Sequence, residues 1–323
     1  MINLAAAELD RLRSRRVVVI WMIVLFVALA GFQVIVGFSV KQPSEQQIAT
    51  ARHQFQQAQR EYDLHHDTDV AQCQTANPGQ PADFCDYPRP TWEDYRPQPA
   101  GFADMAGAGV TITVIFSALT FLIVGASSIG AEYGSGAIAN WLSFVPDRNR
   151  VYASKLGVLI MFSAVVGAIA AALTLATTTL LVTVNDGRVV RLGDAAASGA
   201  RGLIVVVVCA AVGFALALIS RHTIAALGAV VGYLVVDFVL NIVMSSFDPL
   251  QRIKPWLPEY NAGAVVNHGY HYQDQVRKVV ADGIEYTSVD RQLTFGHGLT
   301  YLIVVFLLAT AASLVIFRRR DVT

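Results

Sequence analysis

The sequence is poor in charged residues. Charged residues make up 15% of its 323 positions, and hydrophobic residues make up 54%. A soluble domain carries about 25% charged residues, so this composition excludes an ordinary soluble protein and favours a membrane protein. Lysine plus arginine equals aspartate plus glutamate at 24 each, so the charge balance gives no reason to expect a nucleic-acid partner.

The sequence also lacks the motifs of the common ATP-using and hydrolytic sites. No G-x-x-x-x-G-K-[ST] occurs, and the nearest pattern, G-A-S-S-I-G-A-E from Gly125, has no lysine to reach a phosphate. Neither H-E-x-x-H nor G-x-S-x-G occurs. We therefore expect no catalytic residue, no metal site and no cofactor on this chain, which is not expected to be an enzyme by itself.

Six apolar stretches are long enough to cross a bilayer. A spanning helix needs about 20 residues, because the hydrocarbon core is about 30 Å thick. The stretches are 17–40, 102–130, 156–184, 202–219, 223–244 and 298–317. Because they are continuously apolar rather than alternating, they predict helices and not barrel strands. The expected fold class is an all-α polytopic membrane protein.

Basic residues predict how these spans are oriented. With the N-terminus inside, the inner segments hold eleven of the 24 Lys and Arg residues in roughly 50 positions, about double the outer density. We expect both termini, 1–16 and 318–323, on the cytoplasmic side of a cell membrane, and the residue usage suggests a bacterium. Segment 1–16 fits either an amphipathic helix on the inner surface or an ordinary positive flank of the first span.

The largest soluble element is the outer loop 41–101. Ser44 and Gln47 form a capping-box pattern before a helix with a narrow apolar face, which must pack on the rest of the loop or on a partner. The residues of that face are Ile48, Ala51, Phe55, Ala58 and Tyr62. Cys73 and Cys85 lie on the oxidising side in this topology and predict a disulfide, which would contribute about 3 kcal/mol.

The same loop holds metal-ligand residue types. His65, His66, Asp67 and Asp69 lie close together in the sequence. A metal site also needs fixed geometry and supporting hydrogen bonds, which the pattern does not supply. A solvated polar loop is the preferred interpretation.

Polar residues within the spans are candidates for a substrate path. Thr177 and Thr178 lie in the third span, and Asp237 and Asn241 lie four residues apart on one face of the fifth. A carboxylate in a span faces protein or water rather than lipid. Close helix packing through interhelical hydrogen bonds is the alternative for both pairs.

Two further outer segments are expected. Segment 185–201 is predicted to be a loop. Segment 245–297 is predicted to contain short re-entrant helices followed by an extended stretch near 284–294.

The polar segment 131–155 predicts a short transverse helix between the second and third spans. Glycines permit a sharp redirection, an apolar face can bury in a partner's groove, and flanking charges can fix its register. Pro146 would end the helix, and Asp147 is another flanking charge. An interfacial helix with no partner would show much the same pattern, and it is the preferred interpretation of the residues by themselves. If the segment docks on a partner, the residues expected to act there are Glu132, Tyr133, Gly134, Gly136, Ile138, Trp141, Leu142, Val145, Arg148 and Arg150.

The stretch I-G-A-E-Y-G-S-G-A-I-A-N-W-L-S-F-V-P-D-R-N-R-V-Y-A-S-K-L resembles the region after the second span of type-2 ATP-binding-cassette exporter permeases. Six spans, the N-terminal helix, the re-entrant outer helices and the C-terminal F-R-R-R-D extend the resemblance over nearly the whole chain. The first outer loop departs from it, because many members have a shorter one.

The resemblance implies a coupling helix in segment 131–155 that docks on a separate ATPase subunit. It implies two ATPase copies that hold ATP and Mg, and a second permease copy that is identical or a close paralogue. It also implies contact with membrane lipid and export of a lipid, hydrophobic drug or peptide. Two alternatives stay open: a membrane receptor or scaffold with an outer ligand-binding loop, and a secondary carrier that uses Asp237.

Overall fold

The structure is a computed structural model that describes residues 2–79, 81–144, 147–244, 252–280 and 283–319. Six of its helices are long and apolar enough to cross a membrane. They are α2 (Arg16–Ser39), α5 (Phe102–Gly134), α7 (Arg148–Val184), α8 (Leu192–Ser220), α9 (Thr223–Met244) and α12 (Phe295–Arg319). The prediction of an all-α polytopic membrane protein is therefore confirmed.

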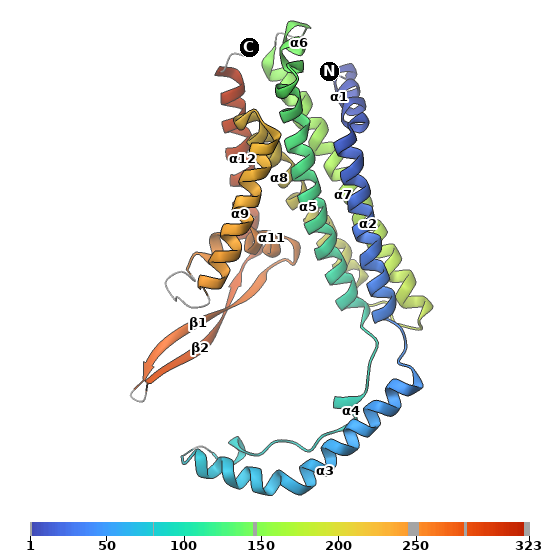
Figure 1. Cartoon of the computed structure of the whole chain (residues 1–323), viewed down its shortest axis with the longest axis vertical. Helices are drawn as coiled ribbons and strands as arrows, with labels where there is room; N and C mark the ends of the chain where they lie inside the picture. Colours follow the sequence, from blue (N-terminus) through green and yellow to red (C-terminus); the bar gives the residue numbers. More distant parts are fainter. Residues whose placement is uncertain (1, 80, 145–146, 245–251, 281–282, 320–323) are drawn as a thin grey trace.

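The spanning helices form a bundle around α8 (Figure 1). α8 is the most deeply buried of the six, and α5, α7 and α12 pack against it. α9 is the least buried, and its large apolar side chains face outward. Both termini and the short helix α6 (Ala137–Phe144) lie at one end of the bundle.

Glycines allow α5 and α8 to pack with their backbones almost touching. A Cβ atom at Gly125 would lie 2.3 Å from the carbonyl oxygen of Ala210, and one at Gly213 would lie 2.0 Å from that of Leu122. No side chain fits in either place. Such close approach increases van der Waals contact, which is the main attraction between helices in lipid.

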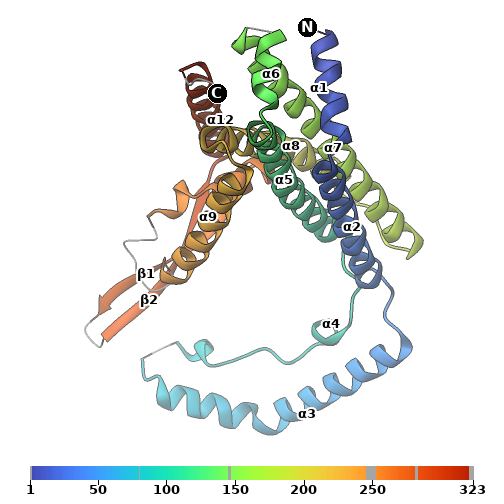
Figure 2. The ribbon, with the colours of Figure 1, turned by 45° about the horizontal axis from the view of Figure 1, so that its top comes forward.

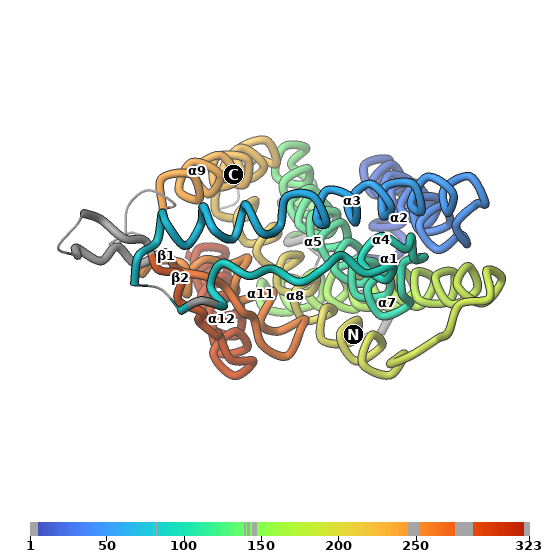
Figure 3. The backbone as a smooth tube through the Cα atoms, turned by 90° about the horizontal axis from the view of Figure 1, so that it is seen from below, coloured from blue at the N-terminus to red at the C-terminus, as the bar shows by residue number. Residues whose placement is uncertain are grey.

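An arm extends from the bundle at the end opposite the termini (Figures 1 and 2). It consists of α3 (Glu45–Ala76), a 3₁₀ turn (Ala82–Phe84), α4 (Trp92–Tyr95) and the irregular chain between them. Figure 3 shows the returning chain running beside α3 along its length.

The predicted capping box begins α3. The Ser44 side chain accepts from the Gln47 backbone, and the Gln47 side chain accepts from the Ser44 backbone. The apolar face predicted for this helix packs on the rest of the loop. Phe55 contacts Trp92 and Tyr95, with ring centroids 5.9 and 5.8 Å apart.

Segment 252–293 contains more structure than the sequence predicts. A 3₁₀ turn (Lys254–Trp256) and α11 (Pro258–Val266) precede two antiparallel strands, β1 (Tyr270–Val280) and β2 (Gly283–Leu293). The extended stretch near 284–294 corresponds to β2, but its partner β1 was not anticipated. Helix α8 also begins at Leu192, inside the segment expected to be a loop.

One ion pair joins the hairpin to the turn before α11, and a second joins its two strands. Asp274 is buried in β1 and pairs with Lys254 at 3.1 Å and with Arg291 at 2.7 Å. An isolated two-stranded ribbon is marginal in water, so these contacts help to hold its base in place.

Candidate coupling site

The described part of the polar segment between α5 and α7 is a turn followed by a short helix. α5 ends at Gly134, and Gly136 has φ +71, a left-handed conformation that favours glycine. α6 follows, and then Asp147 caps α7 by accepting from the backbone N–H groups of Asn149 and Arg150. The expected short helix is thus present as α6 at this position.

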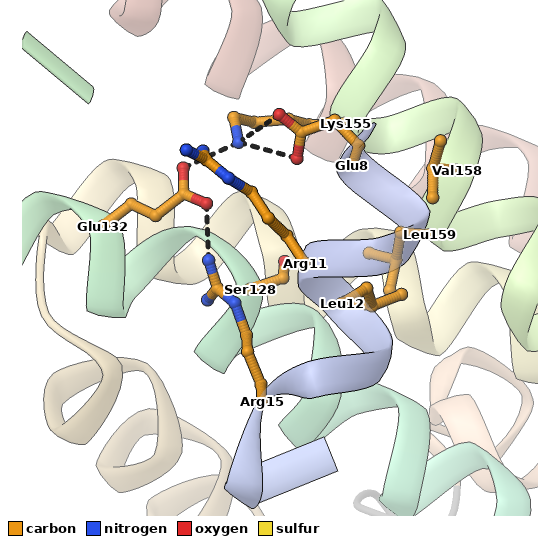
Figure 4. Close-up of a pocket in the computed structure, with 9 residues that line it drawn as sticks. All are labelled: Glu8, Arg11, Leu12, Arg15, Ser128, Glu132, Lys155, Val158 and Leu159. Carbon is orange, nitrogen blue, oxygen red and sulfur yellow. Dashed lines mark hydrogen bonds and ion pairs between the residues drawn. The ribbon is translucent and has the colours of Figure 1, made fainter. Parts of the chain in front are cut away.

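A buried ionic network joins α1 (Ile2–Ser14) to α5 and α7, the helices that flank α6 (Figure 4). The Lys155 ammonium lies 2.9 Å from both carboxylate oxygens of Glu8 and 2.7 Å from Glu132. Arg15 pairs with the other oxygen of Glu132 and donates to the Ser127 carbonyl at 2.8 Å. Glu132 is therefore held by one cation from α7 and by another from the junction between α1 and α2.

The network excludes nearly all water. Glu8, Glu132 and Lys155 are at most 7% exposed, and the hollow between these side chains measures only about 20 Å³. A charge removed from water is stable only when its partners stay in place. Because Glu132 lies in the last turn of α5 and Lys155 lies near the start of α7, the network connects both helices flanking α6 to α1.

A second set of contacts joins the start of α7 to the end of α12. The Arg148 guanidinium donates to the carbonyls of Phe317 and Arg318, each at 3.2 Å. Arg318 in turn donates to the Asn149 side chain at 2.6 Å. A cation at these carbonyls also interacts favourably with the helix dipole.

The structure places the predicted docking residues in different surroundings. Ile138 is 1% exposed and packs in the chain's own core, so it cannot enter a partner's groove in this conformation. Tyr133 is half-buried with the Arg221 guanidinium 5.9 Å from its ring. Arg150 is exposed and pairs with Asp147 at 3.1 Å. The side chains of Trp141 and Leu142, and the whole of Val145, lie outside the described residues.

Two of the ten predicted docking residues bond to other parts of this chain. They are Glu132 and Arg148, which hold the ends of the segment that contains α6. In this conformation they are positioning residues rather than contact residues.

The four residues considered for a substrate path are not brought together. Thr178 is fully buried and donates to Gln33 of α2 at 3.3 Å, whereas Thr177 bonds to carbonyls of its own helix. Asp237 and Asn241 bond to each other on α9. Figures 1 and 2 show α9 on the far side of α5 from the half of α7 that lies away from the termini.

Asp237 has a partner that sequence reasoning missed. Glu259 of α11 lies beside it and accepts from the Tyr233 hydroxyl at 3.0 Å. Burial, and then the neighbouring Asp237 carboxylate, raise the pKa of Glu259 above its ordinary value. The signal available in the sequence was the position of Glu259 in a short apolar segment next to a span.

The predicted disulfide between Cys73 and Cys85 is present, with Cα atoms 5.7 Å apart. It closes the end of the arm, where the returning chain turns back along α3.

His66, one of the residues considered as a metal ligand, instead bonds to other side chains of the arm. It lies 2.9 Å from Asp86 and packs between Tyr62 and Tyr87. The hydrogen bond with Asp86 raises the pKa of His66 above its ordinary 6.5. The charged pair therefore stabilises the arm at acidic pH, and this contribution is lost as the pH rises through the raised pKa. Within the described ranges, no three His, Cys, Asp or Glu residues gather as a metal site would require.

The fold and the site together define a polytopic helical membrane protein with a short helix braced at the end of the bundle that holds both termini. The sequence matches the family described as ABC-2 family transporter protein over residues 2–322. The chain therefore belongs to the ABC-2 transporter family, as the resemblance indicated. No curated protein matched the chain.

Proposed function

We propose that this chain is the permease subunit of an ATP-driven exporter and that α6 is the helix on which a separate ATPase subunit acts. ATP and Mg would bind to two copies of that ATPase. The permease would work as a pair, with an identical copy or a close paralogue. The cargo class that suits an apolar path is a lipid, hydrophobic drug or peptide.

The observation that carries this proposal is the bracing of α6. It is a short helix at the end of the bundle, and charge pairs or capping bonds fix both of its flanks to α1 and α12. A push on a loosely tethered helix would be lost as local motion. A push on α6 would be transmitted to α1, α5, α7 and α12 together, as rigid-body switching requires.

The disulfide supports the proposed orientation. Cys73–Cys85 lies in the arm, at the end of the bundle opposite the termini. Disulfides persist in oxidising compartments, so the arm would be outside and α6 would face the cytoplasm, where ATP is present.

The test is purification from native membranes in mild detergent, followed by identification of any ATPase subunit that remains bound. The double substitution Trp141→Ala with Arg150→Glu changes α6 and its exposed neighbour, whereas Arg188→Glu changes an exposed arginine at the other end of the bundle. We expect the double variant to lose the ATPase subunit and vanadate-sensitive ATP hydrolysis, and the control to keep both. Equal retention by both variants would remove α6 from the docking site. A wild-type protein that binds no ATPase would instead favour the receptor or carrier interpretations.

A further inference from the structure

A cavity of about 550 Å³ opens at the root of the arm. Its volume falls in the range of about 300–1,000 Å³ typical of small-molecule sites. Its walls come from the connector after α2, the first turns of α3, α4 and the proline-rich return to α5. The side chains that matter are Gln42, Ile48, Arg52, Trp92, Arg96 and Gln98.

The cavity lies close to the ends of two spanning helices. The two connectors meet where the Ala100 backbone donates to the Ser39 carbonyl at 3.0 Å. Ser39 is the last residue of α2, and Phe102 is the first of α5. Since both helices are apolar spans, the cavity lies near the level at which lipid headgroups begin.

The charge of the cavity differs from that of the arm that contains it. Segment 41–101 carries nine Asp and Glu residues against five Lys and Arg residues. Among the described residues that line the cavity, however, the ionic side chains are Arg52 and Arg96, and none is a carboxylate. An acidic arm therefore has two guanidinium groups gathered at its root.

Both arginines are arranged to accept an anion. The Arg52 guanidinium lies 5.9 Å from the Trp92 ring, which positions it without neutralising it. Arg96 lies 3.8 Å from Glu93, and both side chains are more than half exposed. An exposed pair at that distance is weak, so a phosphate could compete for Arg96.

We propose that this cavity binds the phosphate of an anionic amphiphile. Arg52 and Arg96 would donate to the phosphate oxygens, for which the guanidinium geometry is well suited. Gln42 and Gln98 would bond to headgroup hydroxyl or ester oxygens. Ile48 and Trp92 supply the apolar wall for the attached carbon chain. The ligand would bridge the arm to the outer ends of α2 and α5.

The phosphate could belong to a membrane lipid or to a soluble phosphate compound, and three probes distinguish these sources. The purified full-length chain in detergent is titrated with short-chain phosphatidylglycerol, with short-chain phosphatidylcholine and with inorganic phosphate. Arg52→Gln with Arg96→Gln removes both guanidinium groups. Arg60→Gln with Arg188→Gln is the matched control, because both residues are exposed and lie outside the cavity.

We expect phosphatidylglycerol to bind the wild type and the control alike, and to bind the double variant about tenfold more weakly, as the loss of charged hydrogen bonds implies. Tighter binding of phosphatidylglycerol than of inorganic phosphate identifies a lipid ligand, and the reverse order identifies a soluble one. No binding to the wild type, or equal binding to all three proteins, would overturn the proposal.

A second measurement covers the case in which the double variant misfolds. In the wild type, the bound probe should slow hydrogen exchange in residues 42–52 and 92–99. Unchanged exchange in these two segments at saturating probe also overturns the proposal. Neither measurement depends on α6 or on the ATPase, so the outcome is independent of the proposed export function.

Discussion

At the scale of single residues, Lys155 is the central residue of the ionic network at the candidate coupling site. It is buried between two carboxylates, Glu8 and Glu132, that come from different helices. Removing one partner of a buried ion pair leaves the others without compensation, which is far more costly than the loss of an exposed pair.

We predict that Lys155→Met lowers the free energy of unfolding by about 3–5 kcal/mol, because two buried carboxylates would then lie side by side. Denaturation of the purified protein in detergent would measure it. Arg150→Met, at an exposed position close by, is the control and should change the same quantity by less than about 1 kcal/mol. Equal effects of the two substitutions would show that the network contributes no special stability.

The sequence alone could not predict this network. Lys155 and Glu132 were visible as charges at the ends of the second and third spans. Glu8 lies more than a hundred positions away in a helix that the sequence could also explain as a charged flank. Which acid meets which base is decided by how α1 packs, and helical periodicity carries no information on that packing.

At the scale of elements, the contact between α5 and α8 sets the geometry of the bundle. Its glycines Gly125 and Gly213 are in direct contact with the facing backbone, whereas no atom of the described residues lies within 4 Å of a Cβ position at Gly157 of α7. Chemically identical substitutions should therefore have opposite effects at the two kinds of position.

We predict that Gly213→Ala destabilises the protein by about 1–3 kcal/mol, since the added methyl must push α8 away from the Leu122 carbonyl. Gly157→Ala should be neutral or stabilising by up to about 1 kcal/mol, because alanine is the better helix former. Thermal unfolding of both variants in the same detergent makes the comparison. A destabilised Gly157→Ala variant together with an unaffected Gly213→Ala variant would contradict the close packing.

The elements differ in how well the sequence predicted them. The spanning helices were visible because lipid demands a continuous apolar run. Strand β1 was not, because Asp274 takes the place of an apolar residue and interrupts the alternation that Tyr270 and Tyr272 begin. The start of α8 was missed because Leu192 to Arg201 is helical before it becomes fully apolar.

At the scale of the whole molecule, the arm and the bundle are separate packing units. The arm is closed by its own disulfide and by aromatic contacts between α3 and the returning chain. The bundle has its own core, in which neither cysteine of the disulfide takes part.

We predict that the double variant Cys73→Ser with Cys85→Ser loosens the arm by about 3 kcal/mol and leaves the unfolding of the bundle unchanged. Limited proteolysis should cut the variant faster than the wild type between residues 77 and 91. The thermal unfolding of the helical bundle should be nearly the same in the variant as in the wild type. A matching drop in the thermal stability of the bundle would show that the two units fold together.

The hydrogen bond from the Ala100 backbone to Ser39 has a consequence for how this chain can be altered. It brings the two ends of a segment of about 60 residues to one point, so the arm is an insertion with a narrow attachment. A short loop could replace it and still join α2 to α5 in their present register. The arm could equally be exchanged for another domain whose ends lie close together, without any helix of the bundle having to move.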